Sequence, residues 1–187
     1  MSKCILDLGT NSMGGYNTLV PMLGIDDSWD KVFVEPNPEH YDYIDEQIKS
    51  IPNSTFYKKA LCLDNKIHTI LTRDDMIGDS AATILGLNFI GNSIGSVNQA
   101  VPKYLSYEVE GITLEQILSK ITASEIYIKM DIEGAEYDVL EHFPFQYQEK
   151  IKKIFVEFHA HDEVMRNRRL DIIGAFADKN ITLLNWD

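Results

Sequence analysis

The stretch Ile126-Tyr127-Ile128-Lys129-Met130-Asp131-Ile132-Glu133-Gly134-Ala135-Glu136 joins a short apolar run to a turn rich in carboxylates. The run is rich in β-branched and aromatic residues, which is typical of a strand buried on both faces of a parallel sheet. Asp131 follows the run directly, so its side chain is expected at the carboxyl end of the strand. A helix is expected next, because Ala135, Val139 and Leu140 are spaced to share one face.

Apolar runs of the same kind recur along the chain and alternate with helix-period segments. The other predicted strands lie around residues 4–6, 32–34, 55–57, 154–156 and 181–184, with an extra strand or hairpin around 67–71. The other predicted helices follow Asn37-Pro38, follow the capping box Thr113-Leu114-Glu115-Gln116, and carry the stripe Leu170, Ile173 and Ala177. This alternation predicts one α/β domain over residues 1–187 with right-handed crossovers.

The composition excludes several classes of protein. The 187 residues include 17 Lys and Arg against 29 Asp and Glu, a net charge of −12. This charge argues against a protein that binds nucleic acid or an anionic membrane. Cys4 and Cys62 have no metal-ligand spacing and are expected to be free thiols. The N-terminus reaches Asp7 after three apolar residues, which argues against a signal peptide and for a cytoplasmic protein.

Four carboxylates come directly after a predicted strand core: Asp7, Glu35, Asp131 and Glu157. The carboxyl ends of the strands form the ligand crevice of an open α/β sheet. Glu35 lies 26 residues after Gly9 (35 − 9), roughly where a carboxylate binds the hydroxyls of an adenosine ribose. An acidic crevice repels the pyrophosphate of a dinucleotide and attracts a cationic cofactor. S-adenosylmethionine, which carries a sulfonium and an ammonium, suits it better.

The block Tyr127–Leu140 resembles the signature of the FkbM family of S-adenosylmethionine-dependent methyltransferases. Further segments follow the order of that family: Asp7-Leu8-Gly9-Thr10-Asn11, Val34-Glu35-Pro36-Asn37-Pro38, Lys59-Ala60-Leu61, Gly111-Ile112-Thr113-Leu114 and Val156-Glu157-Phe158-His159. The resemblance implies a Rossmann-like class I methyltransferase fold, an open and mostly parallel sheet with helices on both faces. The last strand of the family's sheet is expected to be absent or supplied differently. The implied reaction is methyl transfer to a hydroxyl oxygen of a sugar or another small molecule.

The expected cofactor-binding residues are Asp7, Gly9, Asn11, Gly14, Glu35, Ala60 and Asp131. Glu35 is expected to bind the ribose, Asn11 the amino-acid part of the cofactor, and Ala60 to border the adenine. Asp131 and His159 are the expected catalytic residues. Asp131 is a candidate general base, metal ligand or structural acceptor, and His159 a candidate base near pH 7.

Several alternatives stay open. His159 and His161 share a face of an extended segment and could both bind a metal, but no third ligand is evident and no metal ligand is assigned. Glu133 and Glu136 also suit a structural role near a helix N-terminus. Residues 84–102 form either a cover for the site or a surface loop. The chain could also be a non-catalytic binding module or a nucleotide-cofactor enzyme, and an unpaired sheet edge leaves homo-oligomerisation open.

Overall fold

The computed structural model describes residues 1–73, 83–84, 104–160 and 162–186. Its main sheet holds six strands: β1 (Lys3–Leu8), β2 (Asp30–Val34), β3 (Ser54–Tyr57), β8 (Glu125–Met130), β9 (Ile151–Val156) and β10 (Thr182–Asn185). Their order is β10-β9-β8-β1-β2-β3, and every pairing is parallel. All six strands predicted from apolar runs are confirmed. The strand order reverses between β1 and β8, which defines a topological switch point.

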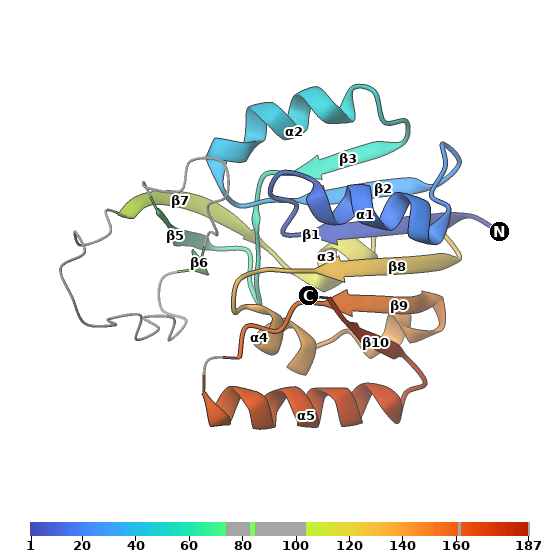
Figure 1. Cartoon of the computed structure of the whole chain (residues 1–187), viewed down its shortest axis with the longest axis vertical. Coiled ribbons are helices and arrows are strands. Elements are labelled where there is room, and N and C mark those ends of the chain that lie inside the picture. The colour runs from blue at the N-terminus through green and yellow to red at the C-terminus, as the bar shows by residue number, and fades with distance from the viewer. Residues whose placement is uncertain (74–82, 85–103, 161, 187) are drawn as a thin grey trace.

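Helices cover both faces of this sheet, as predicted (Figure 1). One face carries α1 (Gly14–Leu23), the short 3₁₀ turn η1 (Pro38–His40) and α2 (Tyr41–Ile48). The other face carries α3 (Leu114–Leu118), α4 (Glu136–Glu141), η2 (Phe145–Lys150) and α5 (Glu163–Ala177). Alternate residues of each strand supply the two cores. In β1, Ile5 packs with the α1 side, whereas Leu6 and Leu8 pack with the α3, α4 and α5 side.

The predicted capping box at the start of α3 is confirmed. Thr113 Oγ1 accepts from the Gln116 backbone N–H at 3.1 Å, and Gln116 Oε1 accepts from the Thr113 N–H at 3.0 Å. The predicted apolar stripe of α5 was wrong, although the helix itself is present. Ile172 and Phe176 are buried in the core, whereas Leu170 is 65% exposed. The aromatic contact between Phe176 and Phe143, with ring centroids 4.9 Å apart, decides which face of the helix turns inward.

A second, smaller sheet contains β4 (Ala60–Leu61), β5 (Ile67–Arg73), β6 (Thr83–Ile84) and β7 (Tyr104–Ile112), in the order β4-β7-β5-β6. The extra strand expected around residues 67–71 is confirmed as β5, which pairs antiparallel with β7. The sequence analysis missed β7. This sheet lies on the side toward which β3, β8 and β9 point (Figure 1). Residues 84–102, the candidate cover for the site, lie outside the described residues apart from Ile84.

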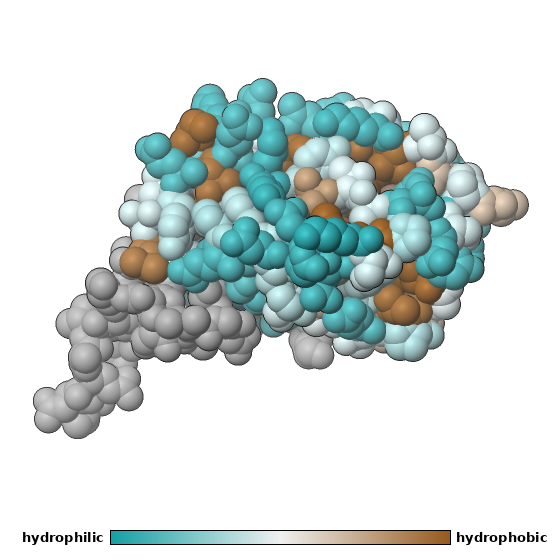
Figure 2. Space-filling view, turned by 90° about the horizontal axis from the view of Figure 1, so that it is seen from above, coloured by the Kyte–Doolittle hydropathy of each residue, from teal (hydrophilic) through white to brown (hydrophobic). Residues whose placement is uncertain are grey.

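The surface seen from above is mainly hydrophilic (Figure 2). Its hydrophobic side chains form small separate groups there, not one broad patch. None of the helices in the described ranges is both long enough and apolar enough to cross a bilayer.

Candidate active site

The loops that follow β1 and β8 meet at the switch point of the sheet. Gly9 has a φ of +78°, and a Cβ atom placed on it would lie 1.7 Å from the Asp131 carbonyl oxygen. A side chain at this position would therefore collide with the backbone of the neighbouring loop. The predicted contact of Gly9 with a cofactor stays a prediction. The positive φ and the close backbone neighbour already explain why this position requires glycine.

Glu35, directly after β2, holds the loop after β1 against the segment that follows β2. Its Oε2 accepts from the Asn11 backbone N–H at 2.7 Å, and its Oε1 accepts from the Asn37 N–H at 2.8 Å. Burial raises the pKa of Glu35 to about 7, although the two backbone hydrogen bonds oppose this shift. Each carboxylate oxygen can accept a second hydrogen bond. Glu35 can therefore bind hydroxyl groups of a ligand without releasing the loops.

The side chain of Asn11 offers a hydrogen-bond acceptor that none of the described residues uses. Its Oδ1 is buried, and no described residue donates a hydrogen bond to it. Buried polar atoms are nearly always paired, so such an atom in a crevice suits a ligand that donates a hydrogen bond. Next to this loop, a Cβ atom on Gly14 would meet no atom within 4 Å. The loop after β1 therefore has both room and an unused acceptor.

Lys129 is a site residue that the sequence analysis missed. Its side chain is 3% exposed, and its Nζ donates to the Gly9 carbonyl oxygen at 2.5 Å. The same Nζ lies 3.3 Å from Asp7 Oδ1 and 3.5 Å from Asp131 Oδ2. Burial opposes the charge, but the two carboxylates outweigh it and raise the pKa of Lys129. The signal in the sequence is a lysine inside the apolar run at residues 126–130.

Lys129 also changes the role of Asp7. The sequence analysis placed Asp7 after a strand core, at a free carboxyl end. The structure instead extends β1 through Leu8, so Asp7 lies inside the strand and pairs in register with Lys129 of β8. Asp7 is 1% exposed. The carboxylate therefore balances a buried ammonium, and its predicted contact with the cofactor stays a prediction.

His159, the third residue after the end of β9, lies among four carboxylates. Its Nδ1 is 3.1 Å from Glu136 Oε1, and its Nε2 is 3.4 Å from Glu133 Oε2. The carboxylates of Glu157 and Asp131 follow at 3.8 and 3.9 Å from Nε2. The structure therefore brings the two predicted catalytic residues, Asp131 and His159, together.

Glu136 explains how His159 is held. This carboxylate is fully buried, and its Oε1 accepts from the His159 backbone N–H at 2.8 Å. Its Oε2 accepts from the Gly134 N–H at 2.8 Å. Glu136 thus ties the turn after β8 to the segment after β9.

The carboxylates keep the imidazole of His159 protonated. Burial opposes the charge, but Glu136, Glu133 and Asp131 together raise the pKa of His159 to about 9. At pH 7 the ring is therefore an imidazolium and a proton donor, which does not fit a general base near neutrality. The carboxylate of Asp131 lies 3.5 Å from Lys129 Nζ and 3.9 Å from His159 Nε2, so both cations stabilise its ionised form. Its predicted catalytic role stays a prediction.

We expect His159 to titrate with a midpoint near pH 9, measured from the pH dependence of its imidazole NMR resonances. The ordinary value is 6.5, so the folded state binds this proton more tightly than the unfolded state does. Its contribution to stability is fully present below about pH 6.5 and is lost as the pH rises through about 9. The change Glu136→Gln should lower the midpoint, whereas Glu46→Gln, on an exposed part of α2, should not. A midpoint at 6.5 or below in the unmodified chain would contradict this arrangement.

Ligand atoms of Asp131, Glu133 and His159 lie within 4.8 Å of one another, a spacing that a metal ion could also use. The imidazolium and the Lys129 ammonium already supply positive charge at this edge. His161, the other histidine considered as a ligand, lies outside the described residues. Ala60 is buried in β4, where it pairs with Gly111.

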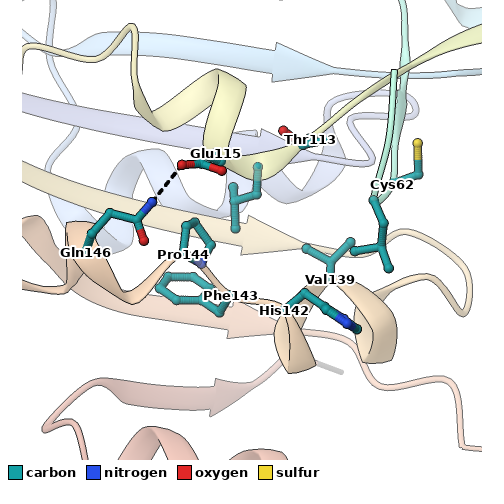
Figure 3. Close-up of a pocket in the computed structure, with 10 residues that line it drawn as sticks. Cys62, Thr113, Glu115, Val139, His142, Phe143, Pro144 and Gln146 are labelled. Atoms are coloured by element: carbon teal, nitrogen blue, oxygen red, sulfur yellow. Dashed lines mark hydrogen bonds between the residues drawn. The ribbon is translucent and has the colours of Figure 1, made fainter. Parts of the chain in front are cut away.

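A groove of about 380 Å³ lies elsewhere, between the turn after β4, the start of α3 and the end of α4 (Figure 3). It is lined by Cys62, Leu63, Thr113, Leu114, Glu115, Val139, His142, Phe143, Pro144 and Gln146. None of the predicted site residues is among them. The groove is therefore not the crevice at the carboxyl ends of the strands.

The strand order, the switch point between β1 and β8, and the carboxylate after β2 together define a Rossmann-like class I methyltransferase fold. A family model for the methyltransferase FkbM domain matches residues 7–177, and the chain belongs to this family. Membership supports a role as a methyltransferase enzyme.

One solved structure supports the fold. The crystal structure of methyltransferase FkbM from Methylobacillus flagellatus KT superposes with a TM-score of 0.51 at 13% sequence identity. The match covers 93% of this chain and 38% of that one, so the chain spans well under half the length of this relative. A search of the curated proteins finds no match.

Proposed function

We propose that the chain transfers a methyl group from S-adenosylmethionine to a hydroxyl oxygen of a sugar or another small molecule. The observation that carries the proposal is the loop after β1, where the buried Asn11 Oδ1 has no donor among the described residues and the Asn11 N–H is held by Glu35. The cofactor offers the donors that this loop lacks, an ammonium on its amino-acid part and two hydroxyls on its ribose. Asn11 would accept from the ammonium and Glu35 from the ribose.

The charge of the crevice supports the same cofactor. Glu35, Asp131, Glu133 and Glu157 lie at the carboxyl ends of β2, β8 and β9. A sulfonium and an ammonium are attracted to such an edge, whereas the pyrophosphate of a dinucleotide is repelled. The net charge of −12 likewise favours a small acceptor over a nucleic acid.

When bound, S-adenosylmethionine supplies an electrophilic methyl group. The acceptor hydroxyl must lose its proton during the transfer, and we assign Asp131 to receive that proton. Lys129 Nζ, 3.5 Å from Asp131 Oδ2, orients this carboxylate. His159 Nε2, 3.9 Å from Asp131 Oδ1, carries a proton that can hydrogen-bond an acceptor oxygen. These residues contribute chiefly by orienting the acceptor.

The test is calorimetric titration of S-adenosylmethionine into the chain and into Glu35→Gln. We expect the substitution to weaken binding by about tenfold or more, because a hydrogen bond to a charged group contributes roughly 1.5–3 kcal/mol. The matched control is Glu46→Gln, because the Glu46 side chain is 69% exposed on α2. Thermal melting of each variant confirms that it is folded.

Three other outcomes would each count against a part of the proposal. Unchanged affinity in Glu35→Gln would refute the assignment of the ribose site. A folded chain that does not bind the cofactor would refute the methyl donor. Binding without turnover on a panel of sugars and other hydroxylated acceptors would favour a non-catalytic binding module.

The affinity for S-adenosylmethionine should also depend on pH. Ribose hydroxyls donate to the ionised carboxylate, and the pKa of Glu35 is about 7. Between pH 6 and pH 8 the ionised fraction of such a group rises about tenfold, so the affinity should rise by up to about tenfold. Titrations at both pH values measure this change, and Glu35→Gln should lack it. A flat profile in the unmodified chain would contradict the role of Glu35.

A further inference from the structure

Three potential metal ligands lie close together around the turn that joins β4 to β5. They are Cys62, Asp64 and His68, and their ligand atoms all lie within 4.8 Å of one another. Cys62 Sγ is 3.3 Å from His68 Nε2, and Asp64 Oδ1 is 2.7 Å from the same nitrogen. All three side chains are partly buried. The cluster does not include any residue of the candidate active site.

The two contacts to His68 Nε2 cannot both be satisfied by one proton. A neutral imidazole nitrogen carries either one hydrogen or one lone pair, so it serves one partner at a time. Asp64 is the nearer partner. The Cys62 thiol can instead donate its one proton to the backbone oxygen of Asp64 at 3.1 Å or to that of Ala60 at 3.4 Å. A cation in place of the shared proton would let sulfur, nitrogen and oxygen bind the same centre.

The distances suit a tetrahedral zinc ion. Zinc binds sulfur at about 2.3 Å and nitrogen or oxygen at about 2.0–2.2 Å, so neighbouring ligand atoms in a tetrahedral site lie roughly 3.4–3.6 Å apart. The Sγ to Nε2 distance of 3.3 Å is already close to that range. The carboxylate oxygen of Asp64 would need to move outward by less than about 1 Å. A thiolate, an imidazole and one carboxylate also favour zinc over magnesium or calcium, which prefer oxygen ligands alone.

The backbone holds these ligands in place before any ion binds. A Cβ atom on Gly111 of β7 would lie 2.6 Å from Cys62 Sγ and 2.4 Å from the Asp64 carbonyl oxygen, so only glycine leaves room for the cluster. The Gly111 N–H donates to Lys66 O at 2.7 Å, and the Lys66 N–H donates to Asp64 Oδ1 at 3.0 Å. These two hydrogen bonds therefore anchor the turn to β7.

We propose that Cys62, Asp64 and His68 form a zinc site with three protein ligands and a fourth position open to water. On binding, the thiol proton of Cys62 passes to solvent, the sulfur binds as thiolate, and the imidazole of His68 binds in its neutral form. The ion would fasten the turn that connects β4 to β5. Cys62 lies at the edge of the groove in Figure 3, with its sulfur directed away from Val139 and His142. The proposal is independent of the methyl donor and of the acceptor.

The test uses cobalt(II) as a spectroscopic probe, with zinc as competitor and a thiol-free reductant. We expect one cobalt per chain and a thiolate-to-cobalt charge-transfer band in the near ultraviolet, which zinc abolishes. Cys62→Ser should remove the band, and His68→Gln and Asp64→Asn should each weaken cobalt binding at least tenfold. Zinc should raise the melting temperature of the unmodified chain but not that of Cys62→Ser. Circular dichroism of each variant confirms folding, and Cys62→Ala replaces a serine variant that does not fold.

Two control variants make the result specific. His142→Gln changes a histidine of the nearby groove that is not in the cluster, and it should keep the band and the affinity. Asp131→Asn changes the other group of potential ligands, and it should also keep both. A band that survives both His68→Gln and Asp64→Asn would indicate binding by a lone thiol and would overturn the proposal. Absence of saturable cobalt binding to the folded chain would overturn it as well.

Discussion

Replacing Lys129 with methionine is expected to lower the free energy of unfolding by about 3–5 kcal/mol, the usual cost of removing one partner of a buried ion pair. The side chain of Lys129 extends from β8 toward Asp7 of β1 and the start of α1, where its Cε would be only 2.7 Å from a Cβ atom on Gly15. Without its ammonium, none of the described residues would supply a cation beside the 1% exposed carboxylate of Asp7. Neither oxygen of Asp7 accepts a hydrogen bond from the described residues. Urea unfolding at pH 7 measures the loss.

The control for this prediction is Lys153→Met, because Lys153 is an exposed lysine on the neighbouring strand β9. Its effect should stay within about 0.5 kcal/mol, as for most surface substitutions. The double variant Asp7→Asn/Lys129→Met should be more stable than Lys129→Met alone, because both charges are then absent. An unfolding free energy of Lys129→Met equal to that of the control would show that the buried pair does not stabilise the fold.

Replacing Gly9 with alanine is expected to destabilise the chain by about 2–5 kcal/mol, from left-handed backbone strain plus a steric collision. The φ of Gly9 is +78°, and the added Cβ would lie 1.7 Å from the Asp131 carbonyl oxygen. The neighbouring atom belongs to the backbone, so the loop after β1 or the loop after β8 must move. Thermal and urea unfolding report the loss. Displacement of either loop should also weaken cofactor binding.

Gly14→Ala is the matched control, since Gly14 begins α1 and an added methyl there meets no atom within 4 Å. Its effect on stability should be below about 1 kcal/mol, and a small gain is the expected sign. Equal losses in Gly9→Ala and Gly14→Ala would contradict the packing of Gly9 against Asp131. A stable Gly14→Ala chain that binds S-adenosylmethionine weakly would instead place the cofactor against α1.

The periodicity of the sequence was enough to predict the main sheet. Short apolar runs such as Ile126–Met130 are typical of strands with helices on both faces of the sheet. The helical segments between the runs are typical of parallel pairing. The capping box at Thr113 was equally readable, because it depends on residues three apart in the chain. The block Tyr127–Leu140 likewise indicated the family that the match over residues 7–177 establishes. Such signals can be recognised in the sequence because they arise between residues that are close together in the chain.

The strand β7 and the buried face of α5 were missed for different reasons. Leu105, Tyr107 and Val109 of β7 alternate with polar residues, a period typical of a half-buried strand, but the prediction relied on continuous apolar runs. The strand pairs along its length with β5. In α5, two overlapping apolar stripes were available. Contacts of Phe176 with Phe143 and Phe145 selected the one that is buried. The choice between the two stripes of α5 depends on partners that are distant in the chain.

By itself the sequence determined the α/β class, the acidic carboxyl edge and the family, because composition and short-range spacing carry that information. Only the tertiary structure decided what each acid does. It placed Asp7 against Lys129 across 122 residues (129 − 7). It surrounded His159 with carboxylates from the turn after β8, the start of α4 and the end of β9. It also brought the side chains of Cys62 and His68 into contact next to Gly111. The charge and the pKa of a buried group depend on its neighbours in space, and those neighbours exist only after the chain has folded.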